Sequence, residues 1–250
     1  SRGPRGASAW KYGKRVYAAP YQMDVNDTTL TKTASGYQAY VNWGGTSNTA
    51  YPTDTVAVEY TIVTPDPGMA CPAGAKPKQG ANLAQYGKTN AVSFSIDTTL
   101  GADQAMYSRV NSTHLLDTTY GAWKLVDVGP LSTPTFTSVS PNNVTFKATV
   151  TATNNSAVTD SFLVIVYRTS DKPSNIATLG VIPSGSTSAT VQCPDWTGKT
   201  VQFGVYAVVG TATSKTRADG VGSYEVTAQM KSATAWQSVA MPSAPTSVSL

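Results

Sequence analysis

Hydrophobic and polar residues alternate along most of this chain in short runs, which is the two-residue period of a β-strand. In the first half, the alternation predicts strands over 21–25, 37–43, 56–62, 92–96, 105–110 and 123–128. In the second half, it predicts strands over 136–139, 144–150, 176–182, 186–191, 201–207 and 224–228. Residues 162–167 form a continuous apolar run, which predicts a central strand covered on both faces.

Glycine, proline and asparagine separate these runs, and no stretch combines a sustained 3.6-residue period with helix caps. Residues 64–80 carry prolines at 65, 67, 72 and 77, so we expect neither strand nor helix there. Short strands at this spacing favour an all-β chain of β-sandwiches with almost no helix.

An internal repeat divides the chain. The dipeptide Ala-Trp ends at Trp10, Trp123 and Trp236, two equal spacings of 113 residues, and a proline-marked start follows each copy. A period of this length suits a domain with its own core rather than a solenoid unit. We therefore predict four parts: the end of a preceding module or linker at 1–17, modules at 18–130 and 131–242, and the start of a following module at 243–250.

Composition and charge narrow the possible partners. Charged residues make up 13% of the chain and hydrophobic residues 40%, which is not the composition of a disordered protein. The net charge of +4 comes from five basic residues within 1–19, so the rest of the chain sums to −1. We therefore expect no nucleic-acid partner. No apolar run reaches about 18 residues, and we expect no insertion into a membrane.

Few residues are candidates for chemistry. The Gly-Lys-Thr triplets at 87–89 and 198–200 lack the first glycine of a phosphate-binding loop and the helix after it, so each predicts a turn. His114 is the single histidine, and Cys71 and Cys193 fall in separate modules, which cannot make a four-ligand zinc site. The two glutamates, Glu59 and Glu225, also fall in separate modules, which disfavours glycoside hydrolysis.

The acidic stretch from Asp24 to Asp27 offers oxygen ligands for calcium, but a polar turn is the simpler interpretation. We accordingly predict no catalytic residue, no cofactor, no metal site and no enzyme. Among the tryptophans, Trp10, Trp123 and Trp236 recur at module ends, which favours packing at a seam between modules over sugar stacking. Trp43 and Trp196, near predicted turns, are the candidates for stacking on a ligand.

The stretch Val201-Gln-Phe-Gly-Val-Tyr-Ala-Val-Val-Gly210, followed by a polar loop and Asp219-Gly220, resembles a fibronectin type III domain. Ser243–Leu250 looks like the start of another such domain. The resemblance implies tandem fibronectin III-like or immunoglobulin-like β-sandwiches. The chain departs from the family in its long modules, in the proline-rich 64–80 loop, and in Phe146, which stands where the family often has a second-strand tryptophan.

Low charge, strands rich in Thr and Tyr, and repeats above 100 residues also resemble structural proteins of bacteriophage tails, fibres and capsid surfaces. This resemblance implies a non-enzymatic structural or adhesion module array of a virion, acting as a spacer or as a host-surface binding platform. Its expected partners are other virion or surface protein subunits, neighbouring modules of the same chain, and a host-surface glycan. The alternative is a bacterial cell-surface adhesin, or a carbohydrate-binding region of a secreted polysaccharide enzyme.

Overall fold

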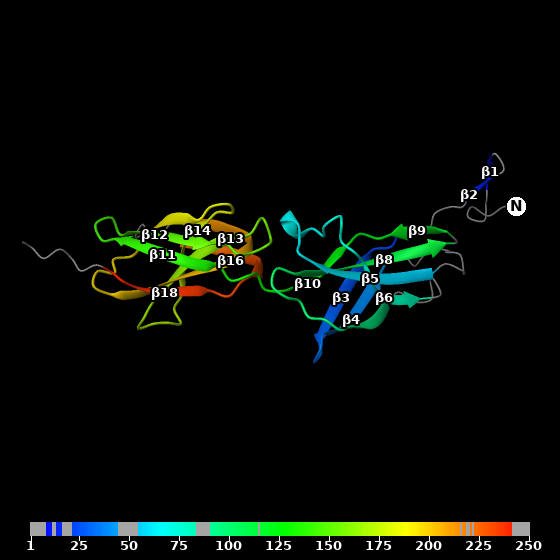
Figure 1. The fold of residues 1–250 in the computed structure, drawn as a ribbon, viewed down its shortest axis with the longest axis horizontal. Coiled ribbons are helices and arrows are strands. Elements are labelled where there is room, and N and C mark those ends of the chain that lie inside the picture. Colours follow the sequence, from blue (N-terminus) through cyan, green and yellow to red (C-terminus); the bar gives the residue numbers. More distant parts are fainter. Residues whose placement is uncertain are drawn as a thin grey trace, which may run out of the picture. The chain divides into compact units, whose positions relative to one another are not determined.

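The computed structural model describes residues 9–11, 14–16, 22–44, 55–83, 91–114, 116–215, 217–218, 221 and 223–241. The chain forms two compact units, each an all-β sandwich (Figure 1). The first unit comprises Ser1–Val63, Cys71–Thr99 and Ala105–Asp127, and the second comprises Thr64–Ala70, Leu100–Gln104 and Val128–Leu250. Near the start of the chain, β1 (Ala9–Lys11) and β2 (Lys14–Val16) pair antiparallel. The expected start of a following module at 243–250 lies outside the described residues.

The first unit has two antiparallel sheets. One has the order β3-β4-β7, from β3 (Val25–Lys32), β4 (Tyr37–Trp43) and β7 (Ala91–Ile96). The other has the order β10-β8-β5-β6, with β9 also on β8, from β5 (Thr55–Val63), β6 (Lys78–Leu83), β8 (Ala105–His114), β9 (Asp117–Tyr120) and β10 (Lys124–Val128).

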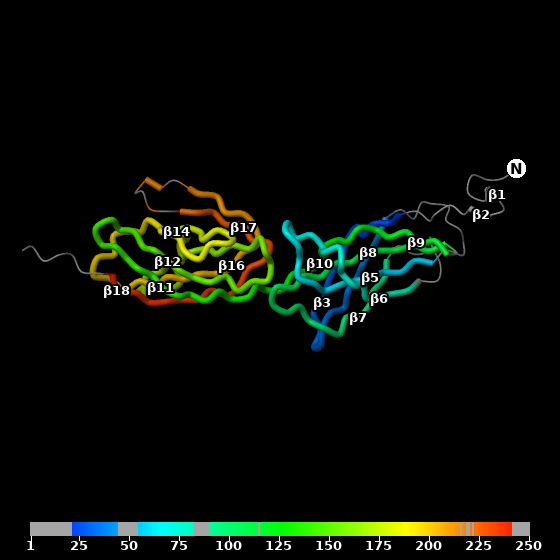
Figure 2. The backbone as a smooth tube through the Cα atoms, turned by 45° about the horizontal axis from the view of Figure 1, so that its top comes forward, coloured from blue at the N-terminus to red at the C-terminus, as the bar shows by residue number. Residues whose placement is uncertain are grey.

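The second unit repeats this plan. Its smaller sheet is β11-β12-β15, from β11 (Thr135–Asn142), β12 (Lys147–Thr153) and β15 (Ser188–Gln192). Its larger sheet is β14-β13-β16-β17, with β18 also on β16, from β13 (Phe162–Thr169), β14 (Ala177–Ile182), β16 (Thr200–Lys215), β17 (Ser223–Lys231) and β18 (Ala235–Ala240). Figure 2 shows the long β16–β17 hairpin standing apart from the body of this unit.

The two units share one topology. In each, the first, second and fifth strands form one sheet, and the third, fourth, sixth and seventh strands form the other. The seventh strand is split in two in each unit, as β9 and β10 or as β17 and β18, and both parts lie beside the sixth strand. This division of strands is that of a fibronectin III-like or immunoglobulin-like sandwich, which confirms the fold class predicted from the alternation.

Each core lies between the inner faces of two sheets. In the first unit, the largest fully buried side chains include Trp43, Tyr107 and Ile96, and in the second they include Phe203 and Leu163. The apolar run 162–167 lies in β13, whose residues 163–166 are all buried, so the prediction of a strand covered on both faces is confirmed. On its outer face, Val164 and Val166 pack with Tyr206 and Val208.

Several predicted boundaries were wrong. The opening strand starts at Val25 and continues to Lys32 rather than ending at 25, because pairing with β4 holds an exposed polar stretch in extended form. The strand predicted from Val144 begins only at Lys147, since the Asn142 side chain accepts hydrogen bonds from the backbone of Val144 and Thr145 in a tight turn. In that turn Phe146 has φ +51°, so it occupies no second-strand position.

The proline-rich loop also contains regular structure, contrary to expectation. A short 3₁₀ turn spans Pro67–Met69, and β6 starts at Lys78, directly after Pro77. Pro67 fits because the first residues of a helical turn need no backbone N–H donor. Strands β6, β9 and β18 were not predicted. No helix in the described residues is long and apolar enough to span a membrane.

Candidate ligand-binding site

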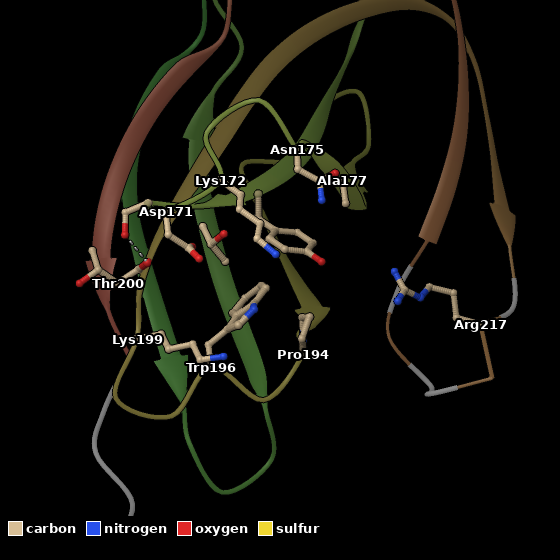
Figure 3. A pocket seen from close by; sticks show the side chains of 12 residues that line it. Asp171, Lys172, Asn175, Ala177, Pro194, Trp196, Lys199, Thr200 and Arg217 are labelled. Carbon is tan, nitrogen blue, oxygen red and sulfur yellow. Dashed lines mark hydrogen bonds between the residues drawn. The ribbon is translucent and has the colours of Figure 1, made fainter.

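The second unit has a pocket of about 600 Å³ at one end of its larger sheet. Twelve residues line it, and Figure 3 shows their side chains. The charged and amide-bearing residues among them are Asp171, Lys172, Asn175, Lys199 and Arg217. They come from three places in the chain: the β13–β14 connection, the β15–β16 connection and the β16–β17 hairpin. The volume lies within the ~300–1,000 Å³ range of small-molecule sites.

A tight turn after β13 forms one wall. The Lys172 N–H donates to the Thr169 carbonyl at 3.1 Å, and the Asn175 N–H donates to the Lys172 carbonyl at 3.0 Å. Arg168 donates to the Pro173 carbonyl and so ties the turn to its strand. Proline at 173 suits a turn because its φ is already restricted. The turn predicted at Asp171-Lys172-Pro173 is confirmed.

The loop before β16 forms a second wall. The Lys199 N–H donates to the Trp196 carbonyl at 2.8 Å, and Gly198 between them has φ +71°, which a residue with a Cβ rarely adopts. The triplet Gly198-Lys199-Thr200 is therefore a turn that leads into a strand, as predicted. The other triplet, at 87–89, lies outside the described residues.

The acidic groups near the pocket stay ionised. Hydrogen bonds from Thr169 and from its own backbone, with the nearby charges of Lys172 and Lys199, lower the pKa of Asp171. Hydrogen bonds from Thr197, with the charge of Lys199, likewise lower the pKa of Asp195. Asp195 is occupied by its own turn, because both the N–H and the hydroxyl of Thr197 donate to its Oδ1. Asp171, in contrast, lines the pocket.

The two tryptophans predicted to stack on a ligand are core residues, which disfavours an open face for stacking. Trp196 is 4% exposed and packs between Tyr167, at 4.5 Å between ring centroids, and Phe203, at 5.8 Å. It reaches the pocket wall without offering an open ring face. Trp43 is 1% exposed on β4, and its indole N–H has no hydrogen-bond partner among the residues that the structure describes. Proximity to a turn was no sign of exposure, because both rings are buried within their own units.

The recurrent tryptophans lie over their own sheets. Trp123, just before β10, and Trp236, in β18, lie at corresponding places near the second part of the split seventh strand, so they recur one module apart. The guanidinium of Arg109 lies 4.4 Å from the Trp123 ring, and that of Arg168 lies 3.9 Å from the Trp236 ring. Each arginine belongs to the same unit as its tryptophan. The predicted seam contact remains untested, and the side chain of Trp10 lies outside the described residues.

The other residues considered for catalysis or metal binding form ion pairs or hydrogen bonds within the fold, or are buried. Glu59 forms an ion pair with Arg109 at 2.7 Å, and Glu225 pairs with Lys215 at 2.8 Å. Asp24 accepts a hydrogen bond from the Ala122 N–H, and Asp27 accepts one from the N–H of Thr28. His114 is buried at the end of β8. Within the described residues, no group of three or more His, Cys, Asp or Glu side chains is arranged to hold a metal ion.

Sequence reasoning missed Lys172, Asn175, Lys199 and Arg217 as site residues, since it placed Lys172 and Lys199 only in turns and gave Asn175 and Arg217 no role. A signal was present nonetheless. In this topology, the loop from the third strand to the fourth and the loop from the fifth to the sixth lie at the same end of the sandwich. Lysines in both loops therefore point to a shared site, provided the strand order is known.

Comparisons with known proteins identify no family for this chain. No family model matches the chain, and no curated protein matches it. One similar solved structure is a segment of two fibronectin type III domains from chicken tenascin. It is 11% identical, covers 87% of this chain and 99% of its own, and has a TM-score of 0.34. Another, comprising the first three fibronectin domains of chicken contactin (CNTN1), is also 11% identical, covers 92% and 70%, and has the same TM-score. At these scores, neither similarity supports an argument about function.

Proposed function

We propose that this chain is part of a non-enzymatic structural and adhesion module array of a bacteriophage virion, in a tail, a fibre or a capsid decoration. The observation that carries the proposal is the repetition of one sandwich topology in two consecutive units. Repeated units of this kind extend a chain by a set length per module, and their end loops are free to vary for binding. Several weak contacts along an array add up through avidity.

The low content of charge and the engagement of Glu59 and Glu225 in ion pairs support a role without catalysis. The pocket in the second unit supports the binding-platform version over a pure spacer, because its loops bring charged side chains together in a concave site. The proposed partners are other virion subunits and a host-surface glycan. The competing function is a bacterial surface adhesin, or a sugar-binding region of a secreted polysaccharide enzyme.

Immunogold electron microscopy with antibodies raised against the chain tests the location. Samples are purified virions and washed cells of the source that carries the gene. We expect gold particles on virion tails, fibres or capsids. Label confined to the cell envelope, or to a secreted enzyme fraction, would reject the virion role and favour the alternative. Incubation of the protein with host polysaccharides is expected to release no reducing ends, and their release would reject the non-enzymatic assignment.

A further inference from the structure

The structure carries an inference about the ligand of the pocket, which rests on the proposed adhesive function. Three of the seven basic residues in 128–250 line this one pocket: Lys172, Lys199 and Arg217. Asp171 is the single acidic residue among the lining residues, so the four charges sum to +2. Lys172 and Lys199 line the same pocket as Asp171, and their charges help to lower the pKa of its carboxyl. The pocket is therefore a positive site with an ionised acceptor inside it.

We propose that this pocket binds a sugar that carries an anionic group, with Lys172 and Lys199 holding the anion. Lysine ammonium groups from two loops form charge-assisted hydrogen bonds with a carboxylate or sulfate. Asp171 and Asn175 then form hydrogen bonds with the sugar hydroxyls, since an ionised carboxylate accepts hydrogen bonds and an amide both donates and accepts them. Figure 3 shows Asp171, Lys172 and Asn175 on one side and Lys199, Trp196 and Pro194 below them.

The remaining wall suits a carbohydrate ring. Tyr167, Pro194 and Ala177 contribute carbon surface to the same pocket. Sugar rings present C–H faces between their hydroxyls, so mixed polar and apolar lining matches them better than it matches a phosphate backbone. Nucleic acids require a basic track along a surface. Among the other basic residues described in 128–250, Lys215 is paired with Glu225, and Arg168 and Lys231 lie over aromatic rings. Lys147 lies on β12 of the other sheet, so these described residues do not continue such a track from the pocket.

Arg217 provides a third positive charge from the β16–β17 hairpin, facing the loop walls across the pocket in Figure 3. Its placement adds long-range attraction for an anion. Arg217 and the two lysines attract the anion close to solvent, where dissolved salt screens charges. The screening length is about 10 Å at 0.1 M salt, so we expect added salt to weaken binding.

The test is isothermal titration of the full chain at low ionic strength with matched pairs of probes. Trigalacturonic acid is compared with its methyl ester, and N-acetylglucosamine 6-sulfate with N-acetylglucosamine. We expect an acidic probe to bind at least tenfold more tightly than its neutral twin. The pair that responds identifies a carboxylate or a sulfate as the anion. Equal binding of acid and neutral twin, no binding of any probe, or equal binding of a short polyglutamate peptide would overturn the proposal.

Variants locate the binding. Lys172→Gln and Lys199→Gln are each expected to lower affinity for the acidic probe about tenfold, the equivalent of one charged hydrogen bond. Lys147→Gln is the matched control, because Lys147 is an exposed lysine on β12 of the other sheet. An equal loss of affinity in all three variants would indicate unspecific attraction to positive charge and would contradict binding in this pocket. All three lysines are exposed, so unchanged thermal unfolding checks that folding is preserved.

The outcome is separable from that of the virion role. Gold label on virions without binding of acidic sugars would reject the site alone. Binding of acidic sugars by a chain found on the cell envelope would keep the site and reject the virion location.

Discussion

The guanidinium carbon of Arg168 lies 3.9 Å from the centroid of the Trp236 ring. The same arginine donates through Nε to Gln202 at 2.6 Å, so its side chain is fixed by neighbours on two strands. Trp236 in turn packs against Val164, Val166, Tyr206 and Val208 on the outer face of the larger sheet. The repeated tryptophan thus stabilises its own sandwich by covering the side of the sheet that faces away from the core.

Removing the Trp236 ring is expected to destabilise the second unit. Trp236→Ala should lower the free energy of unfolding by about 2–3 kcal/mol, because a half-buried indole and the contacts beneath it are lost. A double-mutant cycle with Arg168→Ala should give a coupling of about 1 kcal/mol for the cation–π contact. Urea unfolding measures both. Val144→Ala, at a side chain 78% exposed, is the control and should change little. A coupling energy near zero would contradict a stabilising cation–π contact between Arg168 and Trp236.

The Trp236 ring also requires a glycine beneath it. A Cβ on Gly204 would lie 2.9 Å from Cε3 of Trp236 and 2.7 Å from Cγ2 of Thr234. Gly204→Ala should therefore destabilise the second unit by about 1–3 kcal/mol through overpacking. Gly74→Ala is the matched control, because a Cβ there meets nothing within 4 Å. Equal stability of the two variants in thermal unfolding would show that the ring shifts without cost.

The hydrogen bonds of Asp103 predict how the stability of the second unit changes at low pH. Its carboxylate accepts hydrogen bonds from the Ser132 N–H, the Ser132 hydroxyl and the Ser156 hydroxyl. Burial by itself would raise the pKa of Asp103, but these bonds outweigh it, and the pKa is lowered from 3.8. The stabilisation is therefore complete above pH 3.8 and is lost as the pH falls through the lower folded-state pKa.

Asp103→Asn tests this assignment. Asparagine tolerates the φ of +61° at this position, so the backbone is retained while the charge is removed. We expect a loss of about 1–2 kcal/mol at pH 7 and a smaller loss of stability between pH 4 and 2 than in the unchanged chain. The measurement is the melting temperature of each protein across that pH range. Parallel curves for the two proteins would contradict the prediction.

The two cysteines should differ in reactivity. Cys193 is buried, and burial raises the pKa of its thiol to about 12, so very little thiolate exists at pH 8. Cys71 is partly exposed. With a disulfide reagent at pH 8, one thiol per native chain should react rapidly, and two should react in denaturant. A Cys71→Ser variant should show almost no rapid reaction. Two rapid thiols in the native chain would contradict the burial of Cys193.

Much of the fold follows from local pattern. Strand β4 coincides with the predicted 37–43, and the run 162–167 lies within β13, because alternation and apolar runs are properties of consecutive residues. Strands that alternate poorly were missed. β9 consists of Asp-Thr-Thr-Tyr with no buried residue, and its pairing with β8, rather than its own pattern, keeps it extended.

The sequence by itself determined the all-β class, most strands, the turns at 171–173 and 198–200, and the existence of a long repeat. Tertiary structure alone decided which tryptophans are covered. Burial of Trp43 and Trp196 depends on side chains that the fold brings over them, such as Tyr167 against Trp196, which no local period encodes. It also decided that Lys172 and Lys199 share a pocket, because hydrogen bonding between β13 and β16 brings together loops that are distant along the chain.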